Sequence, residues 1–141
     1  MRIRKARHAD ALMVLDWRND PMTRAMSRNG EAVSAEEHLA WFGRAVEDPE
    51  RLLFIGEADA GAVGMVRFDL GEPCEVSINL NPAFRGQGLS RDLLAAALQA
   101  CPVRPLEAEI KEENAPSQRL FEGAGFVRLA DRAGLRRYRL G

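Results

Sequence analysis

The feature that most constrains the fold is an alternating strand that leads into a glycine-containing turn and then into a helix. Polar and apolar residues alternate over residues 74–80, with the period of two that is typical of a β-strand. Pro82 and the motif Arg85-Gly-Gln-Gly-Leu-Ser90 follow, and an alanine- and leucine-rich stretch then predicts a helix that ends before Pro102. Unpaired backbone N–H groups and the helix dipole converge at such a turn. The motif therefore predicts a cradle for a pyrophosphate.

The residues of this turn suit contact with a di-anion. Gly86 and Gly88 permit close approach of the backbone, and Arg85 adds positive charge. Two other phosphate loops do not fit, because the Gly-Lys-Ser/Thr of the Walker pattern is absent and Arg91 stands where the dinucleotide fingerprint needs its third glycine. A glycine turn without a ligand is the alternative interpretation.

The rest of the chain predicts an α+β protein with three α/β/α layers. Residues 22–33 are interpreted as a polar connecting segment, because the residue before Pro21 is pushed out of the helical region. Alternating or apolar runs predict strands, and capping residues before apolar periodic stretches predict helices. The expected strands span residues 2–7, 52–58, 62–70, 74–80, 106–111, 126–129 and 135–140, and the expected helices begin near residues 11, 34, 90 and 114.

Two helix starts carry specific capping predictions. Asp10 stands at the N-cap position of the first helix. Ser34 and Glu37 have the spacing of a capping box at the start of the second helix. The expected packed face of that second helix contains Leu39, Phe42 and Val46.

Two strands that are expected at the centre of the sheet have one polar face each. Solvent exposure would explain such faces, but two early helices are available to cover them. The sequence therefore predicts a polar cleft between helices and sheet. The polar faces contain Glu75, Ser77 and Asn79 in the first strand and Glu107, Glu109 and Lys111 in the second.

The order of the elements and three motifs together resemble the GNAT superfamily of acyl-CoA-dependent N-acetyltransferases. The motifs are residues 75–82, residues 85–90, and Asn114-Ala-Pro-Ser-Gln-Arg-Leu-Phe121 with Gly125-Phe126. The resemblance covers nearly the whole chain and implies a single domain over residues 1–141. It implies a mixed, mostly antiparallel seven-stranded sheet with four helices and a splay between strands four and five. It also implies direct transfer of an acetyl group from acetyl-CoA to a primary amine, without a covalent enzyme intermediate.

In the family, the pantetheine arm of acetyl-CoA lies in the splay and pairs with the fourth strand, and the pyrophosphate lies on the glycine turn. Two residues depart from the family pattern: Ser90 replaces the usual glycine or alanine, and Phe121 replaces a tyrosine that donates a proton near the thioester sulfur. A phenyl ring cannot donate, so a water or Ser77 is the expected substitute. The implied cofactor-binding residues are Ile78, Leu80, Arg85, Gly86, Gln87, Gly88, Leu89, Ser90, Asn114, Ser117 and Phe121.

An amine must lose a proton before it attacks a thioester, and the resemblance implies a carboxylate as the base. Glu75 matches a position from which some family members deprotonate the amine, often through water. Glu109 is the second candidate. A surface carboxylate, or one paired with Arg67, is the alternative interpretation of either residue.

Three segments resemble GNAT members that acetylate amino sugars attached to a nucleotide: residues 17–20, 34–42 and 64–69. Arginine suits a diphosphate and tryptophan suits a base or sugar face. Ordinary packing or surface roles are the alternatives, above all for Trp17. The implied acceptor-binding residues are Arg18, Asn19, His38, Trp41, Arg67 and Glu109.

Two other functions stay open on the sequence alone. One is acetylation of a protein N-terminus, as in ribosomal-protein acetyltransferases, for which a long acidic groove would be expected. The other is a non-catalytic acyl-CoA-binding module, which the phenylalanine at position 121 suggests. A compact pocket with both Arg18 and Arg67 would favour the nucleotide-linked acceptor.

Composition excludes several classes of partner. With 20 basic and 21 acidic residues the net charge is −1, so nucleic-acid binding is disfavoured even though the C-terminal stretch is rich in arginine. Two cysteines and two histidines without zinc-like spacing make a metal site improbable. No apolar run is long enough for a bilayer. We expect a cytoplasmic monomer or homodimer that uses a small-molecule amine and acetyl-CoA, with no membrane partner.

Overall fold

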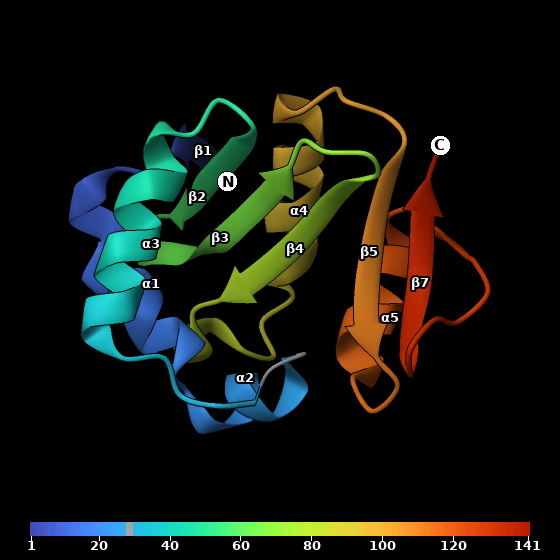
Figure 1. Ribbon diagram of the computed structural model, residues 1–141, viewed down its shortest axis with the longest axis horizontal. Helices are drawn as coiled ribbons and strands as arrows, with labels where there is room; N and C mark the ends of the chain where they lie inside the picture. Colours follow the sequence, from blue (N-terminus) through green and yellow to red (C-terminus); the bar gives the residue numbers. More distant parts are fainter. Residues whose placement is uncertain (28–29) are drawn as a thin grey trace.

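A seven-stranded sheet organises the computed structural model, in which residues 1–27 and 30–141 are described. The strand order is β1-β2-β3-β4-β5-β7-β6, and every neighbouring pair is antiparallel except β4 and β5 (Figure 1). This confirms the predicted mixed, mostly antiparallel sheet. The strands are β1 Arg2–Lys5, β2 Arg51–Ala58, β3 Gly61–Asp69, β4 Cys74–Leu80, β5 Leu106–Lys111, β6 Val127–Arg128 and β7 Leu135–Leu140.

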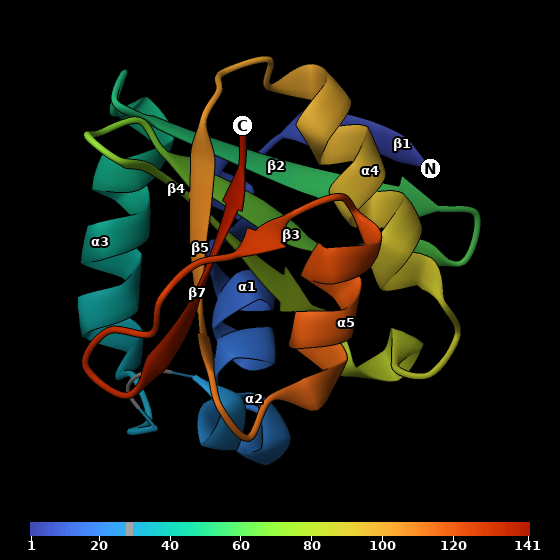
Figure 2. The same cartoon turned by 90° about the vertical axis from the view of Figure 1, so that its right-hand side faces the viewer.

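Helices cover both faces of this sheet and complete the three predicted layers. Figure 2 shows α1 and α3 on one side and α4 and α5 on the other. The helices are α1 Ala11–Arg18, α2 Pro21–Met26, α3 Ala35–Glu47, α4 Leu89–Ala100 and α5 Ala115–Gly123, with short 3₁₀ turns at His8–Asp10 and Pro82–Phe84. Within residues 1–27 and 30–141, no helix has the length and apolar character that crossing a bilayer requires.

Two apolar clusters hold the layers together. One lies between the sheet and α4 with α5, where Phe68, Leu93 and Tyr138 are fully buried. The other lies under α1 and α3, where Phe42 and Ile55 are fully buried. Since β2 and β3 alternate their side chains between the two clusters, this part of the sheet is fixed from both faces.

The predicted splay between β4 and β5 is present. Cys74 pairs with Leu106 and Glu75 with Glu107, and the register goes no further in the described structure. On its other side β4 stays paired with β3 from residue 75 to residue 80. The edge of β4 from Val76 onward therefore opens on a gap, which is visible between the two ribbons in Figure 1.

The segment between the first two long helices differs from its prediction. Residues 22–33 were expected to be a polar connector, but α2 forms over Pro21–Met26. The carboxylate of Asp20 accepts a hydrogen bond from the Thr23 N–H, and Pro21 occupies the first helical position. Proline is favoured there because its missing N–H needs no partner. The same Asp-Pro pair thus ends α1 and starts α2. Residues 28–29 of the predicted connector lie outside the described residues.

Two details of the capping predictions also change. Ser34 Oγ accepts from the Glu37 N–H at 3.1 Å as expected, but the buried residues of α3 are His38, Phe42 and Ala45, and Leu39 is 44% exposed. Asp10 precedes α1, but its carboxylate makes no cap bond to that helix. It binds the Arg4 guanidinium and accepts from the Arg7 N–H instead, because a buried charge is better satisfied by a cation.

Candidate functional site

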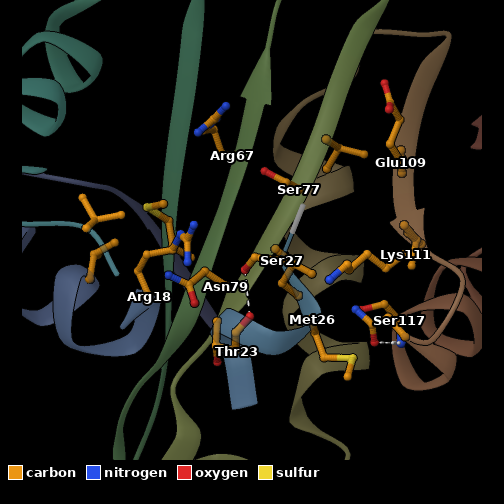
Figure 3. Close-up of a pocket in the computed structure, with 18 of the residues that line it drawn as sticks. Arg18, Thr23, Met26, Ser27, Arg67, Ser77, Asn79, Glu109, Lys111 and Ser117 are labelled. Atoms are coloured by element: carbon orange, nitrogen blue, oxygen red, sulfur yellow. Dashed lines mark hydrogen bonds between the residues drawn. The ribbon is translucent and has the colours of Figure 1, made fainter. Parts of the chain in front are cut away.

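A cavity of about 540 Å³ lies between α1, α2 and α3 and the open part of the sheet. It confirms the predicted polar cleft and brings together ten of the predicted site residues (Figure 3). These are Arg18, His38, Trp41, Arg67, Ser77, Ile78, Glu109, Asn114, Ser117 and Phe121.

One wall of the cavity is the gap between β4 and β5. Ser77 is an exposed residue of β4, and its side chain carries a hydroxyl into the cavity (Figure 3). Across the gap, Asn114 caps α5 and accepts a hydrogen bond from the Ser117 N–H at 3.3 Å. Because β5 leaves this edge of β4 uncovered, backbone groups of β4 remain available to an extended ligand, in the way that an added strand would use them.

The glycine turn lies between β4 and α4, outside the cavity lining. Gly86 and Gly88 have φ values of 75° and 74°, and a Cβ at either position would meet no heavy atom within 4 Å. In the described part of the chain, the N–H groups of residues 86–88 have no backbone acceptor. The first N–H groups of α4 follow them and have no intrahelical acceptor either. The turn is therefore an open array of donors that suits a pyrophosphate.

Arg85 has a different contact from the one that its motif suggests. Its guanidinium binds the Asp20 carboxylate and donates to Thr23 Oγ1 at 3.0 Å. These bonds also lower the pKa of Asp20. Arg85 thus ties the glycine turn to the start of α2. Gln87 likewise bonds within the turn region, to the carbonyl of Ala83.

The opposite wall carries cationic and aromatic side chains. Arg67 forms a bidentate pair with Asp69 and lies 5.2 Å from the ring centroid of Trp41. Arg51 lies over the same ring at 5.9 Å and also pairs with Asp69, but it does not line the cavity. The Trp41 indole is therefore held between two guanidinium groups, and one of them faces the cavity.

Two titratable groups of this wall are His38, which is buried, and Arg18, which is partly buried. Burial lowers the pKa of the Arg18 guanidinium, and the charge of Arg24 adds to the effect. Burial also lowers the pKa of His38; its hydrogen bond to the Ala11 carbonyl opposes the shift, and the charge of Arg18 reinforces it. His38 is 4% exposed, so the surface role considered for it is wrong.

Several predicted site residues lie outside the cavity lining, whereas Glu109 is part of it. Glu75 belongs to the end of β4 that is still paired with β5, and it is not part of the cavity lining. Asn19 is also outside the lining, and its amide makes two hydrogen bonds with the backbone of Val33, at 2.8 and 2.9 Å. Leu80 packs against the α4 side of the sheet. Glu109 lines the cavity and lies 3.5 Å from the guanidinium of Arg132.

Other lining residues were not identified as site residues from the sequence. Those of α2 were missed because this helix was interpreted as a connector. Lys111 ends the polar face of β5, and its Nζ donates to the carbonyl of Ala25 at the end of α2, at 3.0 Å. The missed lining residues include Thr23, Met26 and Ser27, whereas Asn79 and Lys111 were expected on the polar faces of the cleft but were given no role.

The family described as acetyltransferase (GNAT) domain matches residues 1–127 of the chain. The chain belongs to the GNAT acetyltransferases. Among the described residues, no group of three or more histidine, cysteine or acidic side chains is placed to hold a metal ion.

Similar proteins agree with this assignment. YwnH of Bacillus subtilis (strain 168), named as a proposed phosphinothricin acetyltransferase, is 34% identical over 139 residues, with 90% of this chain and 84% of YwnH covered. A crystal structure of a proposed phosphinothricin N-acetyltransferase is 29% identical, with a TM-score of 0.80 over 98% of this chain and 96% of that one. YncA of Salmonella typhimurium, a proposed acetyltransferase solved with its cofactor acetyl-CoA, is 25% identical, with a TM-score of 0.77 over 99% and 92% of the two chains.

The GNAT enzyme described here is thus an acetyl-CoA-dependent N-acetyltransferase. The alternative of a non-catalytic acyl-CoA-binding module is not supported. Acetyl-CoA supplies a thioester whose carbonyl carbon an amine can attack. The residues that could hold it are the open edge of β4 and the N–H groups of the glycine turn.

Phe121 contributes no donor to this GNAT site. It is 2% exposed, lines the cavity, and packs edge-on against Phe126 with ring centroids 5.0 Å apart. The sole tyrosine, Tyr138, is buried outside the cavity and donates to Glu122 at 2.9 Å. Burial and that neighbouring carboxylate raise the pKa of Tyr138. A tyrosine thus cannot serve as the proton donor here.

Proposed function

We propose that this enzyme acetylates the amino group of a small acceptor that also carries an anionic group. The observation that carries the proposal is the cationic wall of the cavity, formed by Arg18 from α1 and Arg67 from β3. Both are arginines, which bind carboxylates, phosphinates and phosphates through paired N–H donors. An acceptor whose anionic group lies between these two arginines would have its amine in the same cavity, near the gap beside β4.

The electrostatics of this wall support the same acceptor. The charge of Arg24 disfavours the protonated form of Arg18, and the charge of Arg18 disfavours protonation of His38, so positive charges lie close together on this side of the cavity. Burial strengthens the effect of these charges, since solvent screens them less. An anionic group on the acceptor would be stabilised there, and a polyamine would be repelled.

The size of the cavity favours a small acceptor. Its volume of about 540 Å³ lies in the lower half of the ~300–1,000 Å³ that small-molecule sites usually occupy. Part of this space must hold the thioester end of acetyl-CoA. What remains suits an amino-acid-sized molecule better than a whole nucleotide sugar.

The relatives point in the same direction. YwnH, 34% identical, is named for phosphinothricin, an amino acid with an acidic phosphinate group. A nucleotide-linked amino sugar is the second candidate, and it is supported by Trp41 beside Arg67 at the cavity. In that case the sugar amine would enter the cavity and the nucleotide would lie outside it. A protein N-terminus has less support, because the lining carries no acidic groove.

We also propose how the chain holds acetyl-CoA. The pantetheine arm lies along β4 near Ile78 and Leu80, and the backbone N–H groups of residues 86–90 bind the pyrophosphate. Ser77 is the hydroxyl of β4 that lines the cavity, and it replaces the missing tyrosine as proton donor to the departing thiolate. The cytoplasmic location stays a prediction from the sequence.

The acceptor class is tested by measuring free thiol released from acetyl-CoA with a panel of amines. The panel contains phosphinothricin, L-glutamate and its diamide, a UDP-linked amino sugar, spermidine and an alanine-starting peptide. We expect the acidic amino acids to be turned over fastest and the diamide to lose at least tenfold in kcat/KM. Equal rates for the acid and the diamide would contradict the proposal, and a preference for the UDP sugar would select the second candidate.

The cationic wall is tested with a matched pair of variants. Arg67→Gln should raise the KM for the anionic acceptor by ~10-fold, since a charge-assisted hydrogen bond contributes about 1.5 kcal/mol or more. Arg51→Gln is the control, because Arg51 shares Trp41 and Asp69 with Arg67 but does not line the cavity. Equal effects of the two substitutions would mean that Arg67 acts only by holding Trp41.

A further inference from the structure

His38 is an imidazole of the cavity that the expected carboxylate mechanism does not use. It comes from the first turns of α3, it lines the cavity, and it is 4% exposed. Its ring stacks on Phe42 with centroids 5.5 Å apart and an interplanar angle of 30°. The ring therefore has a fixed place and orientation on the acceptor side of the site.

The hydrogen bond of His38 determines which ring nitrogen is protonated. Nε2 lies 2.7 Å from the carbonyl oxygen of Ala11 in α1. A carbonyl oxygen only accepts, so Nε2 must carry the proton. In the neutral ring, Nδ1 then has the free lone pair. Among the described residues Nδ1 has no hydrogen-bond partner, and it is not one of the polar atoms sealed from solvent.

We propose that His38 Nδ1 is the base that takes a proton from the acceptor ammonium, directly or through one water. The ammonium has three N–H bonds. One proton passes to Nδ1, and the freed lone pair of the nitrogen attacks the thioester carbon. The N–C bond forms as the C–S bond breaks, the second N–H proton ends on the departing sulfur, and the amide keeps the third. His38 returns its proton to solvent.

Charged groups around His38 suit this role. Arg18 from α1 and Arg67 from β3 line the same cavity, as do Glu37 of its own helix and Glu109 and Lys111 of β5 across it. The lining residues of α2 are uncharged. Burial lowers the pKa of His38, and the charge of Arg18 acts in the same direction, so the neutral ring that can accept a proton is favoured.

The geometry favours His38 over Glu75 as the base. Glu75 is in the paired end of β4 and β5 and does not line the cavity, whereas His38 does. The base inferred here does not depend on an anionic acceptor.

The first test compares substitutions of the two histidines. In His38→Gln, the glutamine amide can still donate to the Ala11 carbonyl, but it cannot take a proton. We expect kcat/KM at pH 7 to fall ~10²-fold with the best acceptor of the panel. His8→Gln is the control, since His8 is exposed and pairs with Glu47 away from the cavity. Glu75→Gln should have a much smaller effect.

A pH series separates a base from a structural residue. The wild-type kcat should fall as pH drops through the pKa of His38, which lies below the ordinary histidine value of about 6.5. The deficit of His38→Gln should shrink as pH rises toward 9, because the amine then loses its proton without help. With hydroxylamine, which is uncharged at pH 7, the variant should match the wild type. An equal deficit with both amines at every pH would overturn the proposal.

A measurement on the ring itself covers the case in which His38→Gln does not fold. The His8→Gln variant contains a single histidine, so ¹⁵N-histidine labelling gives one imidazole to observe. At pH 7 it should show a protonated Nε2 and an unprotonated Nδ1. The opposite tautomer, or a ring that stays charged at pH 7, would contradict the proposal. Neither result depends on which acceptor the enzyme prefers.

Discussion

The two walls of the cavity are built in different ways. The cofactor wall consists mainly of backbone: the uncovered edge of β4 and the N–H groups of one turn, all within residues 76–90. The acceptor wall consists of side chains that come from separate elements, such as Arg18 on α1, His38 on α3 and Arg67 on β3. In the proposed binding mode, a ligand common to a whole family thus contacts atoms that most sequences share. The variable ligand is bound by side chains that can be exchanged without changing the fold.

The largest expected effect concerns Phe121, a side chain of α5 that lines the cavity beside the cofactor wall. Phe121→Tyr would put a phenol in the cavity at the position where the family usually has its proton donor. We expect kcat to rise by ~10²-fold, the lower range for general acid catalysis. The change in kcat is measured by following thiol release at saturating acetyl-CoA.

The neighbouring ring provides the control for this substitution. Phe126 packs against Phe121 and is 4% exposed, but it does not line the cavity. Phe126→Tyr adds the same hydroxyl and should not accelerate the reaction. If Phe121→Tyr is no faster than the wild type, proton donation to the thiolate does not limit turnover.

The second effect concerns the backbone of the cofactor wall. Gly88→Val places a branched side chain at φ 74°, in space that is now open. Because the left-handed conformation costs about 1–2 kcal/mol for such a residue, acetyl-CoA affinity should fall by ~10- to 30-fold. Calorimetric titration with acetyl-CoA gives the value.

Gly134 offers a matched control, since it has φ 78° and equally open surroundings in the turn before β7. Gly134→Val should strain the chain in the same way and leave acetyl-CoA affinity unchanged. A similar loss of affinity in both variants would point to general destabilisation and not to the cradle.

The difference between a wall built of backbone and a wall built of side chains also explains how much of the site the sequence predicted. The glycine turn could be predicted because its geometry depends on neighbouring residues, with Gly86 and Gly88 shaping one turn. Alternating polarity marks β4 and β5 as strands, but the splay between them was implied by the family resemblance. Glu75 was carried over from the family pattern, but two residues of parallel pairing leave it beside β5 and away from the cavity. That pairing is a long-range contact, and no local signal predicts it.

The acceptor wall was predicted less well for the same physical reason. Arg18 and Arg67 do lie at the cavity, but Asn19, next to Arg18, is turned toward Val33. The burial of His38 follows from the angle at which α3 packs on α1. A helical pattern predicts that one face is buried, and packing decides which residue of that face is at its centre.

The third effect tests whether ion pairs support the acceptor wall. Asp10 lies directly before α1 and binds Arg4 in a pair whose side chains are 8% and 24% exposed. The Arg4 hydrogen bonds hold the pKa of Asp10 below its usual range, with help from the Arg7 N–H. Asp10→Asn should lower the free energy of unfolding at pH 7 by about 1.5 kcal/mol.

The sign of the pH dependence follows from that lowered pKa. The stabilisation is present above the ordinary pKa of an aspartate, about 3.9, and is lost as pH falls through the lower pKa of the folded state. The difference between wild type and Asp10→Asn in urea unfolding should therefore disappear in strong acid. Asp59→Asn serves as the control, because its partner Arg2 is exposed and its own side chain is fully exposed. A pH-independent difference would mean that Asp10 acts by packing.

The smallest effect concerns Lys111, which connects the two walls. Its Nζ donates to the Ala25 carbonyl across the opening between β5 and α2. Lys111→Met keeps most of the apolar stem and removes this bond, so α2 should be held less firmly against the cavity. We expect the KM for the acceptor to rise ~3-fold, as the loss of one exposed hydrogen bond implies, with unchanged acetyl-CoA affinity. Lys5→Met, the only other lysine substitution that the chain allows, lies on β1 and should change neither value. A loss of acetyl-CoA affinity in Lys111→Met would show that α2 belongs to the cofactor wall as well. The backbone wall and the side-chain wall would then share an element and could not be treated as separate.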